Sequence, residues 1–174
     1  KPEAKGLVTM PSPLTSGAAL IHAQTLAGVE GLGWDLYKNL AANGATAAGG
    51  NGAVLKSVAS GEKAYGMVVD YMPIREKAKG APVEFVFPKE GVSAVTEPVG
   101  ILASTKNAEA AQKFVHYVLS EKGQDGFVKL GYIPARNGMA LPDGFPARDS
   151  IKVLPINAAE ALKNTDDDLK TFSG

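Results

Sequence analysis

The sequence predicts an α/β fold whose mixed, largely parallel sheet is flanked by helices. Two observations carry this prediction. Short apolar runs with the length of strands alternate with longer stretches that have apolar residues at helical spacing. Gly and Pro residues separate these stretches, as they do at turns. With 174 residues, the chain is long enough to bury a core without disulfides or a metal.

Four short segments have the pattern of strands. The run GLVTM is β-prone and is closed by Pro11 and Pro13, AYGMVV is short and apolar, and VEFVF alternates apolar and polar residues. The predicted strands are residues 6–10, 64–69, 83–87 and 98–103.

The helices are predicted from apolar spacing together with start and stop signals. Thr15 or Ser16 can cap the first helix, Asn43 and Gly44 end the second, and Pro73 opens the fourth. The predicted helices are residues 18–26, 34–42, 53–60, 74–79, 108–119, 123–130, 157–163 and 166–172. Residues 131–149 are rich in Pro and Gly and are predicted to form a loop.

Composition excludes several classes of protein. Eighteen basic residues balance eighteen acidic ones, which argues against nucleic acid or an anionic membrane surface as the main partner. The absence of Cys excludes disulfides, thiol nucleophiles and thiolate metal sites. The first residues show neither an initiator Met nor a signal-peptide pattern. We therefore expect a processed product, whose precursor carried the signal peptide, or an excised fragment.

Two loop-to-helix junctions are candidates for an anion site. One consists of Thr15, Ser16 and Gly17, and the other centres on Asn51 and Gly52. The start of a helix presents free N–H groups and a partial positive charge, and Gly allows a ligand close to the backbone. Ordinary capping is the alternative explanation, and neither junction has a phosphate-loop motif.

Two further positions carry carboxylates. Asp70 and Tyr71 follow a predicted strand directly, where open α/β sheets bind ligands. Asp70 could equally cap the next helix. Glu97 stands just before the predicted strand 98–103, and a solvated loop residue is the alternative there.

No catalytic or metal-binding motif is present. The two histidines, His22 and His116, lie in predicted helices, and there is no GxSxG or HExxH pattern. The acidic residues at 166–168 lack the spacing of a calcium loop. We expect a protein that is not an enzyme and that uses no cofactor and no metal.

Several segments together resemble a known family. They are KGLVTMPSPLTSGAAL, GWDLYKNLAANGA, AVLKSVASGEKAYGMVVDY and PVGILASTKNAEAAQKFVHYVLSEKGQDGFVKLGYIPAR. In content and order they resemble the extracytoplasmic solute-binding proteins of ABC importers. The resemblance is to the branch that contains binders of ferric iron, aminoalkylphosphonates, polyamines and sugar phosphates.

The resemblance implies a type II periplasmic-binding-protein-like fold with two lobes and a hinged cleft, of which the first lobe is mostly missing here. Residues 1–92 would form the core of the second lobe, and residues 93–149 the hinge with a returning segment of the first lobe. Residues 150–174 would be terminal helices packing on the second lobe. The candidate residues named above match positions where the family meets its ligand.

The resemblance also implies a function. The chain would be the periplasmic substrate-binding component of an ABC importer, with a small-molecule ligand and the membrane permease subunits as partners. Helix starts favour an anion and the carboxylates favour hydroxyls or an amine, so a phosphorylated sugar or an aminoalkylphosphonate fits best. The alternatives are ferric iron, a polyamine, or a metabolite-sensing effector domain of a transcription regulator.

A chain lacking one lobe leaves its hydrogen-bonding groups in open solvent. There each hydrogen bond to a ligand replaces one to water, so we expect weak binding. We also expect self-association through the exposed edge of the predicted strand at residues 99–102.

Overall fold

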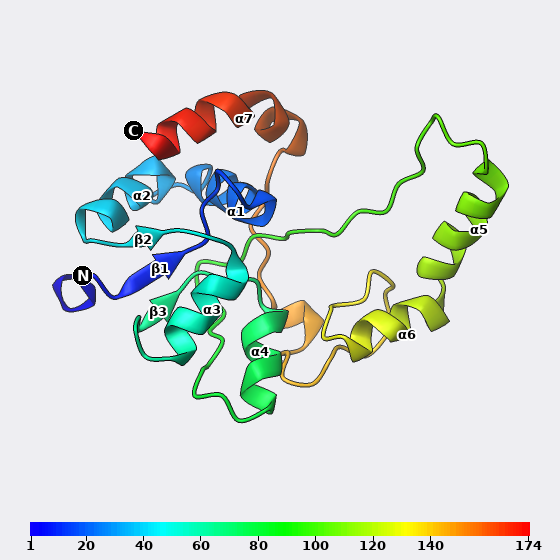
Figure 1. The fold of residues 1–174 in the computed structure, drawn as a ribbon, viewed down its shortest axis with the longest axis horizontal. Coiled ribbons are helices and arrows are strands. Elements are labelled where there is room, and N and C mark those ends of the chain that lie inside the picture. The colour runs from blue at the N-terminus through cyan, green and yellow to red at the C-terminus, as the bar shows by residue number, and fades with distance from the viewer. The chain divides into compact units, whose positions relative to one another are not determined.

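A parallel three-stranded sheet organises the first part of the chain in the computed structural model, which describes residues 1–174 (Figure 1). The strands lie in the order β2-β1-β3. They are β1 (Val8–Met10), β2 (Thr46–Ala47) and β3 (Tyr65–Gly66). Thr9, in the middle of β1, lies opposite Thr46 on one side and Gly66 on the other. The predicted α/β fold with a small parallel sheet and flanking helices is confirmed.

The chain divides into two units. Unit 1 comprises Lys1–Val95 and Ile151–Gly174, and unit 2 comprises Thr96–Ser150. Unit 1 contains the whole sheet, and the chain leaves it and returns to it. The assignment of these segments to two lobes of a larger protein stays a prediction.

Helices cover both faces of the sheet in unit 1. On one side α1, α2 and α7 contact one another, and on the other side α3 contacts β1, β3 and α4 (Figure 1). A short 3₁₀ helix, η1 (Pro2–Ala4), precedes β1. The helices of this unit are α1 (Gly17–Ala27), α2 (Gly33–Ala42), α3 (Asn51–Ala59), α4 (Tyr71–Ala78) and α7 (Ala158–Ser173).

The main core lies on the α1, α2 and α7 side of the sheet. It is built from the buried side chains of Met10, Ala23, Leu26, Tyr37 and Leu154. The Tyr37 ring packs between two other aromatic rings, 5.6 Å from that of Trp34 and 5.8 Å from that of Phe172 between centroids. Aromatic contacts at these distances stabilise the packing of α7 against α2.

Unit 2 is helical and irregular. It holds α5 (Ala108–Val118), α6 (Glu121–Lys129) and the short 3₁₀ helix η2 (Arg148–Ser150). The Gln124 side chain donates to the carbonyl of Val118 and accepts from the amide of Ala135, which fastens the following loop to the two helices. No helix in either unit combines the length and the apolar character that crossing a membrane requires.

Two predicted strands do not form. Residues 83–87 are not paired with any strand, although Phe85 and Phe87 contact each other as the alternation predicts, with centroids 4.8 Å apart. Residues 98–103 are also unpaired, and Val99, Ile101 and Leu102 are exposed. Side-chain alternation stabilises a strand only when a neighbour completes its hydrogen bonds. The predicted self-association therefore has no strand edge at 99–102 on which to rest.

Three other elements differ from the prediction in extent. The strand predicted at 64–69 is limited to β3, because the Val69 amide bonds to a side chain instead of a strand. The two-residue strand β2 was not predicted, since Thr46 and Ala47 carry no apolar pattern. The last two predicted helices form one helix, α7, because the junction at residues 164–165 contains no Gly or Pro.

The segments that connect the two units are fastened inside unit 1. Val92 and Val153 form a parallel bridge, with the Val92 amide 2.9 Å from the Lys152 carbonyl and the Leu154 amide 2.8 Å from the Val92 carbonyl. Next to it, Nδ1 of His22 lies 2.8 Å from the Ser93 hydroxyl. Burial lowers the pKa of His22 below its ordinary value of 6.5.

Gly66 is a position where any side chain would disturb packing. A Cβ added there would lie 2.6 Å from Cγ1 of Val54 and 3.0 Å from Cγ2 of Val58. We expect Gly66→Ala to lower the free energy of unfolding by about 1–3 kcal/mol, the usual effect of overpacking, as measured by urea unfolding. The control is Gly126→Ala, whose Cβ would meet nothing within 4 Å. Equal stability of the Gly66→Ala variant and the wild type would contradict this account.

Burial of His22 predicts a pH dependence of stability. The unfolded chain takes up a proton near pH 6.5, whereas the folded chain does so only at lower pH, so unfolding becomes easier as pH falls below that value. His22→Gln should lose less stability than the wild type between about pH 7.5 and about pH 5.5 in urea unfolding. The control, His116→Gln, changes the exposed histidine and should behave like the wild type. Parallel losses in wild type and His22→Gln would rule the effect out.

Candidate functional site

The loop after β1 leads into α1 and is organised by Ser12. The Ser12 amide donates to the Gly49 carbonyl at 3.2 Å, and its own carbonyl accepts from the amides of Thr15 and Ser16 at 3.1 and 2.9 Å. The Ser16 hydroxyl then caps the helix by accepting from the Ala19 amide at 3.3 Å. The predicted cap at Ser16 is thereby confirmed.

Sequence analysis missed Ser12, which is buried although it is polar. A signal for it was present. Ser12 stands between Pro11 and Pro13 directly after a strand, and prolines have no N–H to offer there. The loop can therefore be held only through the amide, carbonyl and hydroxyl groups of Ser12.

The loop after β2 leads into α3 without a side-chain cap. Gly50 occupies the N-cap position and has no side chain to accept from the first-turn N–H groups. Asn51, the first residue of α3, uses its side chain elsewhere, because its Oδ1 accepts from the Val69 amide at 3.0 Å. Gly52 follows and is exposed. This helix start therefore retains backbone donors for a ligand.

The chain after β3 leads into α4 through Asp70. The Tyr71 amide donates to Oδ1 of Asp70 at 2.7 Å, so Asp70 caps the helix, which was one of its two predicted roles. Burial raises the pKa of the Asp70 carboxyl above its ordinary value of 3.8, an effect that the backbone hydrogen bonds only partly offset. The guanidinium carbon of Arg75 lies 5.7 Å from the centre of the Tyr71 ring.

These three junctions lie along one edge of the sheet (Figure 1). Because β1, β2 and β3 are parallel, their carboxyl ends face the same way, and each is followed by the start of a helix. The bond between Ser12 and Gly49 ties the first junction to the second, and the bond between Asn51 and Val69 ties the second to the third. We call this edge, from Thr15 to Gly17, Asn51 to Gly52 and Asp70 to Tyr71, the carboxyl edge.

The carboxyl edge brings together seven of the eight predicted site residues. Asn51 is joined to the chain beside Asp70, while no hydrogen bond joins Ser16 to either residue. The expectation that Asp70 follows a central strand is wrong, since β3 is at the border of the sheet and β1 is its centre. Glu97 belongs to unit 2, where it is exposed. The carboxyl edge is therefore a feature of unit 1 alone.

The arrangement has a defined chemical preference. The starts of α1, α3 and α4 direct N–H groups and partial positive charge toward the edge, which suits an anion. Asp70 adds an acceptor that suits a hydroxyl or an ammonium group. No group of three or more His, Asp or Glu side chains is placed to hold a metal ion.

A parallel sheet with helix starts gathered at one edge defines a lobe of a ligand-binding α/β protein. Comparison with known families identifies it further. Residues 1–164 match the family described as bacterial extracellular solute-binding protein, and the chain belongs to that family.

Two curated relatives come from Haemophilus influenzae. One, described as an uncharacterized protein, is 30% identical over 132 residues, which are 75% of this chain and 38% of the relative. The other, spermidine/putrescine-binding periplasmic protein 1, is 36% identical over 113 residues, which are 63% of this chain and 30% of the relative. The matches thus cover about a third of each relative's length.

The buried carboxylate of Asp70 generates a prediction about stability. Its raised pKa means that the charged form is disfavoured in the folded chain, so stability is lost as pH rises through that pKa. Asp70→Asn keeps an oxygen that can cap α4 and removes the charge. Urea unfolding should show the variant more stable than the wild type at neutral pH, with the difference shrinking toward about pH 4. The control Asp35→Asn removes an exposed carboxylate of α2. A less stable Asp70→Asn at neutral pH would contradict this reasoning.

Proposed function

We propose that this chain is part of the substrate-binding component of an ABC importer and that its carboxyl edge binds a small polar anion. The observation that carries the proposal is the meeting of three helix starts at one sheet edge in a member of the solute-binding family. Binding alone accounts for the groups present at this edge, so we propose no catalytic step. The proposed location is the periplasm and the proposed protein partners are the membrane permease subunits.

The anion preference follows from donors that the fold leaves open. Gly50 provides no cap for α3, and Gly17 and Gly52 are exposed and have no side chain between ligand and backbone. A phosphate or phosphonate group can accept several backbone N–H bonds at once, as it does at other helix starts. In open solvent each such bond contributes about 1 kcal/mol, so the affinity of this chain alone should be modest.

Asp70 indicates that the ligand carries a second kind of group. A carboxylate facing an inorganic anion would repel it, whereas a hydroxyl or ammonium group can donate to it. A ligand with an anionic end and a donor end satisfies both parts of the edge. A phosphorylated sugar and an aminoalkylphosphonate both have this composition.

A polyamine is the second candidate. One curated relative is named as a spermidine/putrescine-binding periplasmic protein, and Asp70 could accept from an ammonium group. A polyamine would make no use of the helix starts, which favour negative charge. Ferric iron receives less support, because Tyr71 has no second tyrosine beside it and Fe³⁺ prefers several oxygen ligands.

The proposal is tested by titrating the isotope-labelled chain with glucose 6-phosphate, 2-aminoethylphosphonate, putrescine and ferric citrate. Backbone NMR signals of Gly17 and Gly52 report on the carboxyl edge. Shifts of these signals with the two phosphorus compounds, and an unchanged ³¹P spectrum showing no turnover, are the expected result. Shifts with putrescine alone would replace the anion by the polyamine, and shifts with none of the four would overturn the proposal.

A charge variant sharpens this test. Asn51→Asp keeps the oxygen that accepts from Val69 and places a negative charge at the start of α3. We expect it to weaken binding of glucose 6-phosphate by about tenfold or more, through repulsion of the phosphate. Asn39→Asp adds the same charge on the exposed surface of α2 and should change the affinity by less than about twofold. Equal effects of the two variants would show that binding does not occur at the carboxyl edge.

A further inference from the structure

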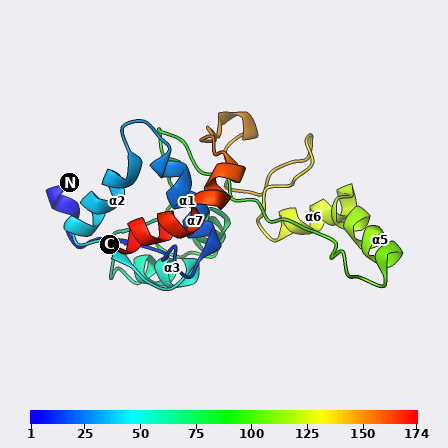
Figure 2. The same cartoon turned by 90° about the horizontal axis from the view of Figure 1, so that it is seen from above.

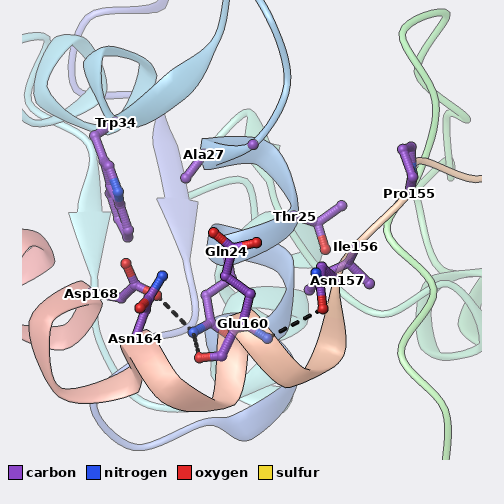
Figure 3. Close-up of a pocket in the computed structure, with 12 residues that line it drawn as sticks. Gln24, Thr25, Ala27, Trp34, Pro155, Ile156, Asn157, Glu160, Asn164 and Asp168 are labelled. Carbon is purple, nitrogen blue, oxygen red and sulfur yellow. Dashed lines mark hydrogen bonds between the residues drawn. The ribbon is translucent and has the colours of Figure 1, made fainter.

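A second polar hollow lies away from the carboxyl edge, on the side of the sheet covered by α1, α2 and α7 (Figure 3). It has a volume of about 440 Å³ and is lined by residues from the end of α1, the start of α2 and one side of α7. Gln24, on α1, is eight residues from Ser16, which corresponds to about 12 Å along the helix. The hollow is therefore separate from the proposed anion site.

The hollow persists because small residues form part of its wall. Ala27 and Gly28 close α1, and Ala161 faces them from α7. None of these side chains is long enough to fill the space. Trp34 stands at one side of the opening, and its ring is held by Tyr37, which packs in turn on Phe172 (Figure 3).

The polar groups of the hollow are held in place but not fully used. Nε2 of Gln24 donates to Oδ2 of Asp168 and to the Ala161 carbonyl, both at 2.8 Å. Oε1 of Gln24 and Oδ1 of Asp168 have no hydrogen bond within the protein, and neither does the side chain of Asn164. Three acceptor oxygens thus remain available around the bond between Gln24 and Asp168.

The charge of the hollow is uniformly negative. Asp168 and Glu160 contribute carboxylates, and no Lys, Arg or His is among the lining residues. The carboxyl end of α1 also opens here, and no basic residue in its last turn offsets the partial negative charge of that helix end. The start of α7 has the opposite polarity, but Asn157 caps it and Glu160 lies in its first turn.

We propose that this hollow binds the ammonium group of a small organic amine. An ammonium group has three N–H donors, which matches the three available oxygens of Gln24, Asn164 and Asp168. Its charge is complementary to the carboxylates and to the end of α1. The face of an indole ring such as that of Trp34 attracts the same cation, and the carbon chain of the amine can lie against the ring. This proposal does not depend on the function assigned to the carboxyl edge.

The test uses n-butylamine, which is protonated at neutral pH, and n-butanol, which has the same chain without the charge. Each is titrated into the isotope-labelled chain while the indole N–H signal of Trp34 and the side-chain amide signals of Gln24 and Asn164 are followed by NMR. The expected result is a saturable shift with the amine and little shift with the alcohol. No shift with the amine, or equal shifts with both compounds, would overturn the proposal.

Two double variants separate this hollow from general attraction to an acidic helix. Glu160→Gln with Asp168→Asn removes both carboxylates and keeps an oxygen that can accept from Gln24. It should weaken amine binding by about tenfold or more, since each lost contact is a charge-assisted hydrogen bond. Asp166→Asn with Asp167→Asn removes equal charge from the same helix outside the hollow and should change affinity by less than about twofold. Equal weakening by both pairs would overturn the proposal.

A third variant tests the role of the aromatic ring. Trp34→Leu should weaken binding of n-butylamine by about threefold to tenfold, the contribution of a cation next to an indole at a partly exposed site. The affinity for glucose 6-phosphate should stay unchanged, because Trp34 is not at the carboxyl edge. An unchanged amine affinity in a variant whose circular dichroism matches the wild type would remove Trp34 from the site.

Discussion

The parallel pairing of β1 with a neighbour on each side is the constraint on which unit 1 depends. A parallel neighbour can be reached only through a crossover, so α1 and α2 lie between β1 and β2 and α3 lies between β2 and β3. Each crossover returns the chain to the same starting edge, which places every helix start at the opposite one. The carboxyl edge is thus a consequence of strand direction and not of any single residue.

The strands themselves are very short, so side chains continue what backbone pairing begins. The Asn51 side chain takes the place of a ladder partner for Val69, and the Ser12 amide extends the pairing of β1 to Gly49. Both residues lie where the proposed ligand would bind. Polar groups that hold the loops together therefore also determine which backbone donors stay open, and Gly50 and Gly52 leave those of α3 accessible.

Local features were predictable from the sequence, and pairing was not. The caps at Ser16 and Asp70, and the periodic apolar residues of α5, depend on neighbours within one or two helical turns. Residues 83–87 have equally good strand periodicity, but a strand exists only if a distant segment pairs with it. The site followed the same division. The helix starts could be recognised from Gly and hydroxyl residues, whereas the bond between Asn51 and Val69, the role of Ser12 and the position of Glu97 in another unit depend on tertiary structure.

The bridge between Val92 and Val153 has a consequence for how the gene of such a protein can change. It brings the points at which the chain leaves and re-enters unit 1 into direct contact. Everything between them is, in topological terms, an insertion whose two ends meet. Such a segment can be lengthened, shortened or exchanged by recombination without threading the chain through the sheet, since only the two strands of the bridge must be kept. The fifty-odd residues of unit 2 and the sheet of unit 1 can accordingly diverge at different rates.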